Sequence, residues 1–215
     1  MVSRLKLKKQ FMKKIMLALL FISSLIGYST INVAAILPPD QLIKQTSDEV
    51  LSTLSANKEK FKAQPDEIYK LVNKIILPHL DFKAMSKLAL GKNWRKANKG
   101  QKYKFLEAFK VMLIRTYSKS LTEYSGQKIK YPKYRPPAEG KRTTKVKTII
   151  DQGSGPEIPI TYSLVLKKGA WKVYDIKIDG ISLVTNYRNT FASDIRRIGI
   201  NGLIKQLEAK YKVKR

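Results

Sequence analysis

The sequence predicts an α+β fold in which a layer of helices packs on a twisted antiparallel sheet of about four strands. Two observations lead to this prediction. Apolar residues recur at helical spacing up to about residue 125, and they alternate with polar residues over much of 128–179. Helical spacing returns after residue 181. Strands grouped between two helical regions are typical of one α+β domain.

Residues 1–35 have the three-part layout of a secretory signal. Residues 1–14 contain six Lys or Arg and no acid, residues 15–27 are largely apolar, and Val33-Ala34-Ala35 supplies small residues for cleavage. We therefore expect cleavage after Ala35 and a single mature domain over residues 36–215. An uncleaved membrane anchor is the alternative.

The composition limits what this domain can bind. The chain has 43 Lys+Arg against 16 Asp+Glu, a formal charge of +27, and loss of the six cations of the signal leaves +21. Such an excess favours an anionic partner. Export without any cysteine indicates the periplasm of a bacterial envelope, where nucleic acid is scarce, so we expect no nucleic-acid partner. A single histidine and no cysteine give no basis for a metal site, and we expect no cofactor.

Four helices are predicted before the sheet, and prolines and glycines mark several of their ends. They cover residues 38–57, 65–78, 81–90 and 99–125. The last is the longest, and its apolar residues, among them Phe105, Phe109 and Met112, repeat every three or four positions. We expect its lysines largely on a solvated surface.

Four strands are predicted next, over residues 128–135, 143–151, 157–167 and 170–179. Pro132 suits an edge position for the first strand, because proline has no N–H to donate to a neighbour. Lys167-Lys168-Gly169 predicts a short turn between the last two strands. Helices over 181–198 and 200–212 complete the chain, with a break near Gly199.

No catalytic arrangement stands out in the sequence. The glycine motifs that bind phosphates or dinucleotides and the nucleophile elbow of hydrolases do not occur. His79 and Asp81 could form a base with its orienting acid, but a helix junction in which Asp81 caps the next turn explains them better. Asp175 and Asp179 could be paired carboxylates, but contacts with neighbouring lysines explain them better. We therefore expect no enzymatic activity.

Two long segments carry an ordered set of motif residues. The first, residues 81–121, contains Asp81, Phe82, Leu90, Gly91, Trp94, Arg95, Gln101, Phe105, Phe109 and Tyr117. The second, AWKVYDIKIDGISLVTNYRNTF (170–191), contains Trp171, Tyr174, Asp175, Gly180, Asn186, Tyr187 and Arg188. In this order the two segments resemble the motifs of the MlaC family. Its members are periplasmic phospholipid-binding proteins, also called toluene-tolerance or ABC-transporter auxiliary proteins. The resemblance spans residues 38–212.

The resemblance implies an NTF2-like fold with a deep apolar pocket for phospholipid tails. It also implies a periplasmic carrier without covalent chemistry, whose phospholipid is cargo rather than cofactor. Such a carrier shuttles lipid between an outer-membrane lipoprotein–porin complex and an inner-membrane MCE-domain ABC transporter complex, and so maintains outer-membrane lipid asymmetry. We expect the protein to act as a monomer.

The lipid-binding residues are predicted from periodicity, and plain core packing is an equal alternative for each of them. They are Phe82, Leu88, Phe105, Phe109, Met112, Tyr117, Tyr162, Leu164, Tyr174, Ile176, Val184, Tyr187 and Phe191. We interpret Trp94 and Trp171 as packing anchors. Arg188 could lie near a lipid headgroup, but a structural ion pair with an acid such as Asp175 is favoured.

Two other functions stay open beside the carrier. An NTF2-like enzyme acting on a hydrophobic small molecule would need a polar dyad deep in the pocket. A polyanion-binding envelope module would use the +21 surface and would need no cavity.

Overall fold

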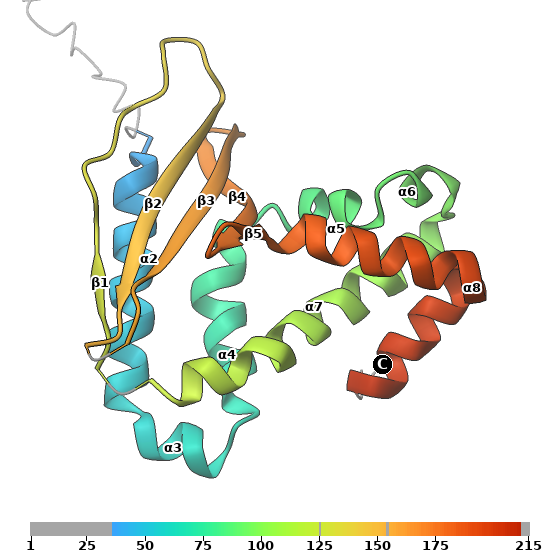
Figure 1. Cartoon of the computed structure of the whole chain (residues 1–215), viewed down its shortest axis with the longest axis horizontal. Helices are drawn as coiled ribbons and strands as arrows, with labels where there is room; N and C mark the ends of the chain where they lie inside the picture. Colours follow the sequence, from blue (N-terminus) through green and yellow to red (C-terminus); the bar gives the residue numbers. More distant parts are fainter. Residues whose placement is uncertain (1–35, 125, 154, 212–215) are drawn as a thin grey trace, which may run out of the picture. The chain divides into compact units, whose positions relative to one another are not determined.

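The computed structural model describes residues 36–124, 126–153 and 155–211. The predicted signal, residues 1–35, lies outside these ranges. The described residues belong to one unit, Ile36–Arg215, in which helices precede the sheet and one long helix follows it (Figure 1). The α+β class predicted from the sequence is confirmed.

In the described ranges, the helices before the sheet are interrupted once, by two irregular turns. They are α2 (Pro39–Ala56), α3 (Lys58–Ala63), α4 (Glu67–Leu71), α5 (Phe82–Leu90), α6 (Asn93–Lys96) and α7 (Lys99–Thr122). Between α4 and α5 lie a π turn, η1 (Val72–Ile76), and a 3-10 turn, η2 (Leu77–His79). The sequence predicts one helix over 65–78. In the structure the helix changes to the wider π turn and then to the tighter 3-10 turn. The cause is Pro78, which cannot donate a helical hydrogen bond and disfavours helical backbone at the residue before it.

Side-chain caps fix where α5 and α7 begin. The Asp81 carboxylate accepts a hydrogen bond from the Ala84 N–H at 3.1 Å, so the predicted capping role of Asp81 is confirmed. Asn98 and Gln101 form a reciprocal capping box at the start of α7. Gly91, with φ at +54°, ends α5 as predicted.

The sheet has five antiparallel strands in the order β1-β2-β3-β4-β5. They are β1 (Lys128–Lys130), β2 (Thr143–Asp151), β3 (Ile158–Lys167), β4 (Ala170–Ile178) and β5 (Ile181–Ser182). The fifth strand, beyond the four expected, is two residues long and occupies the start of the helix predicted over 181–198. β1 ends well before residue 135, just ahead of Tyr131-Pro132, because proline interrupts strand pairing.

A bulge in β4 changes which of its residues face inward. Ser163 of β3 pairs with Asp175 and Leu164 pairs with Val173, so Tyr174 is an extra residue between them. Val173 before the bulge and Ile176 after it both pack on the covered face of the sheet. The strict alternation that predicts one face for Tyr174 and Ile176 therefore breaks at this point.

The last helix, α8 (Leu183–Tyr211), bends sharply at Gly199, where φ is +70°. The predicted break near this glycine is confirmed. Within the described ranges, no helix combines the length and the apolarity needed to span a membrane.

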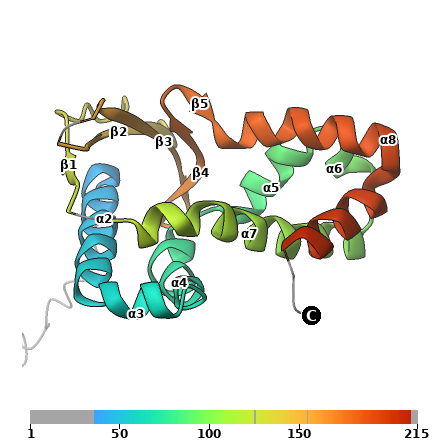
Figure 2. The same ribbon diagram turned by 60° about the horizontal axis from the view of Figure 1, so that its bottom comes forward.

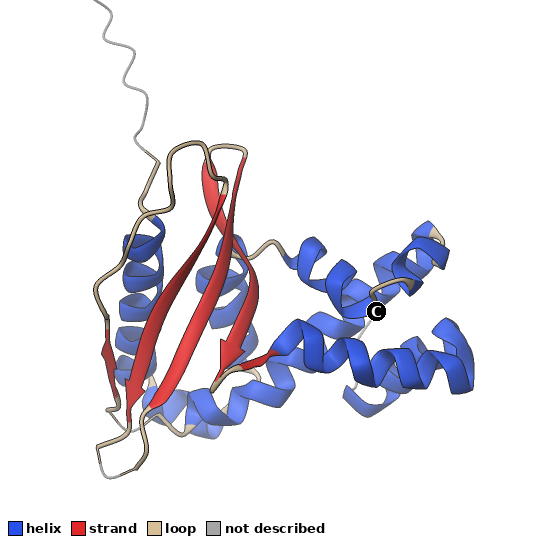
Figure 3. Ribbon diagram, turned by 45° about the horizontal axis from the view of Figure 1, so that its top comes forward, coloured by secondary structure: helices blue, strands red, loops and turns tan. Residues whose placement is uncertain are grey.

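Buried side chains gather in two regions. Helix α7 runs from the helices of one region to those of the other (Figures 1 and 2). One is the helical lobe, which we define as α5, α6, the first half of α7 and α8. In the other, α2, α4 and η1 pack together, and Leu42 and Ile43 of α2 cover one face of the sheet. Figure 3 shows the strands in front and these helices behind them.

Candidate functional site

An apolar cavity of about 300 Å³ lies where the second half of α7 meets β4 and the irregular turns after α4. Its lining is Val72, Ile76, Leu77, Leu80, Phe82, Met85, Lys110, Leu113, Ile114, Tyr117, Ser120, Leu121, Ile176, Ile178 and Leu183. Twelve of these fifteen side chains are hydrocarbon or thioether. This volume is at the lower end of the roughly 300–1,000 Å³ typical of ligand pockets.

The irregular turns supply one wall of the cavity. Val72 and Ile76 lie at the two ends of η1, and Leu77 begins η2. A π turn rotates the side chains that follow it relative to a regular helix. The turns bring Leu80 beside Val173 of β4, and the backbones of these two residues form an isolated parallel β-bridge. The opposite end of β4 contributes Ile178.

The polar members of the lining all come from α7. Lys110 lies 2.7 Å from the Glu107 carboxylate, and 27% of its side chain is exposed. Tyr117 lies beside Tyr187 of α8; burial raises the pKa of Tyr187, and the nearby Tyr117 hydroxyl raises it further. The Tyr187 phenol therefore stays uncharged at neutral pH. Lys110 is the one charged residue among the fifteen, and its charge is balanced by Glu107.

A larger hollow of about 500 Å³ has a different character. It lies between α3 and the end of α7, and its lining includes Lys58, Lys62, Lys119 and Glu123. Such a charged lining does not suit hydrocarbon. The apolar cavity is therefore the better candidate site.

Three of the thirteen predicted lipid-binding residues line the apolar cavity: Phe82, Tyr117 and Ile176. Two groups of the others belong to packed cores. Phe105, Phe109, Met112 and Phe191 are buried in the core of the helical lobe, with Tyr187 against it, whereas Leu164 and Tyr162 pack between the sheet and α2. Val184 is buried in the first turn of α8, and Leu88 and Tyr174 are half-buried on α5 and β4, away from the cavity lining.

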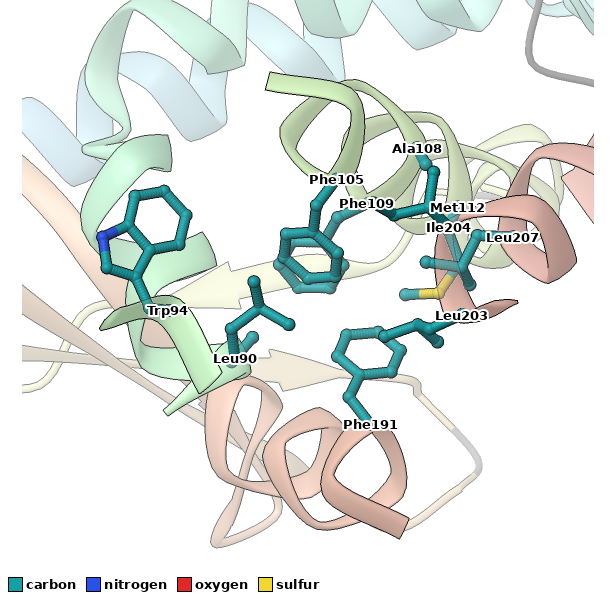
Figure 4. Close-up of a cluster of buried hydrophobic side chains, with 11 residues drawn as sticks. Leu90, Trp94, Phe105, Ala108, Phe109, Met112, Phe191, Leu203, Ile204 and Leu207 are labelled. Atoms are coloured by element: carbon teal, nitrogen blue, oxygen red, sulfur yellow. The ribbon is translucent and has the colours of Figure 1, made fainter. Parts of the chain in front are cut away.

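Aromatic rings that pack against one another fill much of the core of the helical lobe (Figure 4). Phe109 stacks on Phe105 at 5.5 Å between ring centroids and meets Phe191 edge-on at 5.6 Å. Tyr187 stacks on Phe191 at 5.5 Å. Phe82 stacks on Phe109 at 5.6 Å and also lines the cavity, so it forms the wall between the two.

Sequence reasoning missed most of the aliphatic lining. Val72 and Ile76 fit the apolar side of a predicted helix, and nothing in their spacing distinguishes a helix core from a cavity wall. The available signal was Pro78, which disturbs the helix just ahead of it. The alternation predicted over 170–179 places Ile178 on one face with Tyr174 and Ile176, but it does not distinguish a packed core from a cavity wall. Leu183 follows the short turn after β4, where no periodic pattern extends far enough to assign a face.

Among the described residues, Arg188 does not form the ion pair with Asp175 that the sequence favours. Its Nε donates to the Leu88 carbonyl at 2.7 Å, at the carboxyl end of α5, where free carbonyls and the helix dipole favour a cation. Asp175 instead accepts from the Val184 N–H at 3.3 Å. A Cβ on Gly91 would lie 3.3 Å from the Arg188 side chain, so the two motifs of the sequence meet here.

The candidate dyad of His79 and Asp81 is not supported by the contacts of Asp81, whose carboxylate is engaged by Lys167 and by the Ala84 N–H. Asp81 Oδ2 lies 2.8 Å from the Lys167 ammonium. Burial raises the pKa of Asp81, but the hydrogen bonds from Lys167 and Ala84 outweigh it and hold the pKa below its usual value. Burial, followed by the nearby Lys172, lowers the pKa of His79. Among the described residues, no three His, Cys, Asp or Glu side chains gather closely enough to hold a metal ion.

Comparison with known proteins points to one family. The family described as MlaC protein matches residues 44–209. The toluene tolerance protein ttg2D of Pseudomonas putida is 32% identical over 185 residues, which cover 86% of this chain and 84% of that protein. The intermembrane phospholipid transport system binding protein MlaC of Haemophilus influenzae is 25% identical over 173 residues, which cover 79% of this chain and 80% of that protein.

A solved structure has the same fold. It is the phospholipid-binding protein from Ralstonia solanacearum in complex with a phospholipid, with a TM-score of 0.75 and 29% sequence identity. The similarity covers 80% of this chain and 96% of that one. Because the family match and the Pseudomonas putida relative both extend over most of the sequence, this chain belongs to the MlaC family.

Proposed function

We propose that this protein carries phospholipid through the periplasm and holds acyl-chain carbon in the apolar cavity. The observation that carries the proposal is the lining itself, in which twelve of fifteen side chains are apolar and the one charge, Lys110, is paired with Glu107. Relatives named for phospholipid transport and phospholipid binding support it.

The energetics of hydrocarbon in water explain why a carrier needs such a cavity. Each buried methylene is worth about 0.8 kcal/mol, so transfer of a 16-carbon chain through water without a carrier costs on the order of 10 kcal/mol. Aliphatic side chains tolerate many chain shapes, so we expect tail burial to dominate affinity and headgroup selectivity to be weak. The phosphate stays at the cavity edge, on the side of α7 that carries Lys110.

The cavity must widen to accept a whole lipid. Two acyl chains need more room than about 300 Å³. The two walls can separate because they belong to different cores: Ile114 on α7 packs with α4 and η1, whereas Ile176 on β4 packs with the sheet and α2. We infer that lipid enters by moving the second half of α7 away from β4.

The same proposal includes export and two docking partners. The mature protein begins at Ile36 after signal cleavage, acts as a monomer, and exchanges lipid with an inner-membrane MCE-domain ABC transporter complex and an outer-membrane lipoprotein–porin complex. Intact-mass measurement of protein from a periplasmic fraction tests the first step. A mass that retains residues 15–35, with protein in the membrane pellet, would show an anchor instead.

Native mass spectrometry of protein purified without detergent tests the cargo. Wild-type protein should carry the added mass of a phospholipid. Ile178→Glu places a carboxylate on the cavity wall and should lose that mass while remaining folded, because an ionised group beside hydrocarbon is strongly unfavourable. Ile181→Glu is the matched control, since Ile181 is 62% exposed and lies outside the cavity lining. Lipid-free wild-type protein, or a folded Ile178→Glu variant with full occupancy, would overturn the proposal.

A further inference from the structure

The segment of sequence that contains α6 is strongly basic and has no acid. Residues 82–106 hold eight Lys or Arg and no Asp or Glu, and the densest part of this run covers α6 and the first turns of α7. We define the α6 patch as Lys92, Arg95, Lys96, Lys99, Lys102 and Lys104. Figure 1 shows α6 at the end of the helical lobe, distant from the sheet.

These cations are available to a partner. Within the described residues, none of the six forms an ion pair with an acid, and all but Lys102 are exposed. Lys102 extends over the ring of Trp94, with its ammonium 5.6 Å from the ring centroid. Elsewhere on the protein many lysines are neutralised locally, as Lys130 is by Asp151 and Glu157. The α6 patch therefore contributes its charge outward.

The side-chain chemistry of the patch favours a lipid surface over an acidic protein. Five of its six cations are lysines, which are mobile, strongly hydrated point charges. Specific protein interfaces are enriched in arginine and depleted of lysine, whereas anionic lipid surfaces attract either cation without a shaped contact. The hollows lined by Lys110 and by Lys58 contain no residue of the α6 patch. Tyr103, which lies between Lys102 and Lys104 in the sequence, is 67% exposed, and tyrosine is enriched at membrane–water interfaces.

We propose that the α6 patch docks the protein on the surface of anionic phospholipid membranes, end-on through the helical lobe. Docking brings the protein to a bilayer through diffuse attraction between the lysines and lipid phosphates, and Tyr103 lies at the headgroup level. The docking surface is separate from the apolar cavity, so it does not depend on whether the cavity holds lipid.

Vesicle sedimentation at low salt tests this surface. Wild-type protein should pellet with vesicles of equal parts phosphatidylcholine and phosphatidylglycerol and remain in solution with phosphatidylcholine alone. Raising the salt to about 1 M shortens the Debye length to about 3 Å and should release it. The triple variant Lys92→Glu, Arg95→Glu, Lys96→Glu should weaken binding by more than about tenfold, because each cation near an anionic surface contributes about fivefold.

Two control variants separate the patch from other causes. Lys141→Glu, Lys145→Glu, Lys147→Glu makes the same change in net charge on exposed residues of the sheet region, and it should bind vesicles far better than the α6 variant. Ile178→Glu, which acts on the cavity, should bind vesicles like wild type. Equal losses in the two triple variants would show diffuse attraction by net charge, and loss in Ile178→Glu would show attachment through cargo. Either result overturns the proposal. Wild-type protein that does not bind anionic vesicles also overturns it, and would indicate that the α6 patch docks on a protein instead.

Discussion

The aromatic core of the helical lobe and the aliphatic cavity beside it lie along the same helix but are packed differently. In the lobe, Phe105, Phe109 and Phe191 are at most 2% exposed, and their rings meet at 5.4–5.6 Å. The cavity leaves about 300 Å³ among leucines and isoleucines that are mostly half-buried. Rings in fixed stacked and edge-on contacts fill space and hold α5, α7 and α8 together. The fully buried aromatic side chains of the lobe therefore form a scaffold, and the incompletely packed aliphatic side chains form most of the wall of the candidate site.

The largest expected difference between the two regions is in stability. Phe109→Ala removes a fully buried ring that contacts four other rings, and it should lower the free energy of unfolding by about 3–5 kcal/mol. Leu183→Ala enlarges an existing cavity at a half-buried position and should cost about 1 kcal/mol. Urea unfolding of both variants measures the difference. Similar losses would mean that the cavity wall is as tightly packed as the lobe.

A smaller loss is expected at the point where the two sequence motifs meet in the lobe. Gly91→Ala forces a Cβ onto a backbone with φ at +54° and places it 3.3 Å from Arg188, and it should cost about 1–3 kcal/mol. Lipid occupancy should not change. Gly169→Ala is the control, because its φ is +76° but a Cβ there meets no neighbour within 4 Å. If both substitutions lower the melting temperature equally, the contact with Arg188 has no effect on stability.

Asp81 joins α5 of the helical lobe to β3 of the sheet, and its removal should cost about 1 kcal/mol. It caps α5, and its carboxylate pairs with Lys167 at the end of β3. Because the pKa of folded Asp81 lies below its usual value, its contribution is present at neutral pH and is lost as the pH falls below about 4 through the folded pKa. The melting temperature of Asp81→Asn should therefore be lower than wild type at neutral pH and converge with it in acid. A gap that stays constant at every pH would show that the carboxylate charge has no part in the contact.

The smallest effect is expected at His79, beside the cavity wall. His79→Gln should leave lipid occupancy unchanged in native mass spectrometry, because His79 is absent from the cavity lining and Asp81 is engaged by Lys167. Loss of function in this variant alone, with normal folding and occupancy, would favour the enzyme alternative over the carrier.

Local sequence was sufficient for the elements with strong periodicity or clear end signals. The helix that ends at Gly91 and the strand over 143–151 lie where they are predicted. The π turn at Val72–Ile76 could not be predicted, because the apolar spacing continues as in a helix while Pro78 and packing against β4 decide the geometry. The bulge at Tyr174 depends likewise on pairing with β3, which a single strand does not reveal.

The candidate site was less predictable than the fold for a related reason. Periodicity identifies the side of a helix that is buried, but a filled core and a cavity wall have the same period. Phe105 and Phe109 on α7 therefore appear equivalent to Tyr117, although only Tyr117 of the three lines the cavity. Most of the aromatic residues that periodicity predicts as lipid contacts pack against one another in the structure.

A crystal structure of the protein purified from the periplasm without detergent most directly tests whether the aliphatic cavity, and not the aromatic lobe, holds the cargo. We expect acyl-chain carbon within about 4.5 Å of Ile176, Ile178 and Leu183, with the second half of α7 displaced from β4 and the rings of the lobe unchanged. Acyl chains inserted between Phe105, Phe109 and Phe191, with the cavity closed, would contradict this assignment.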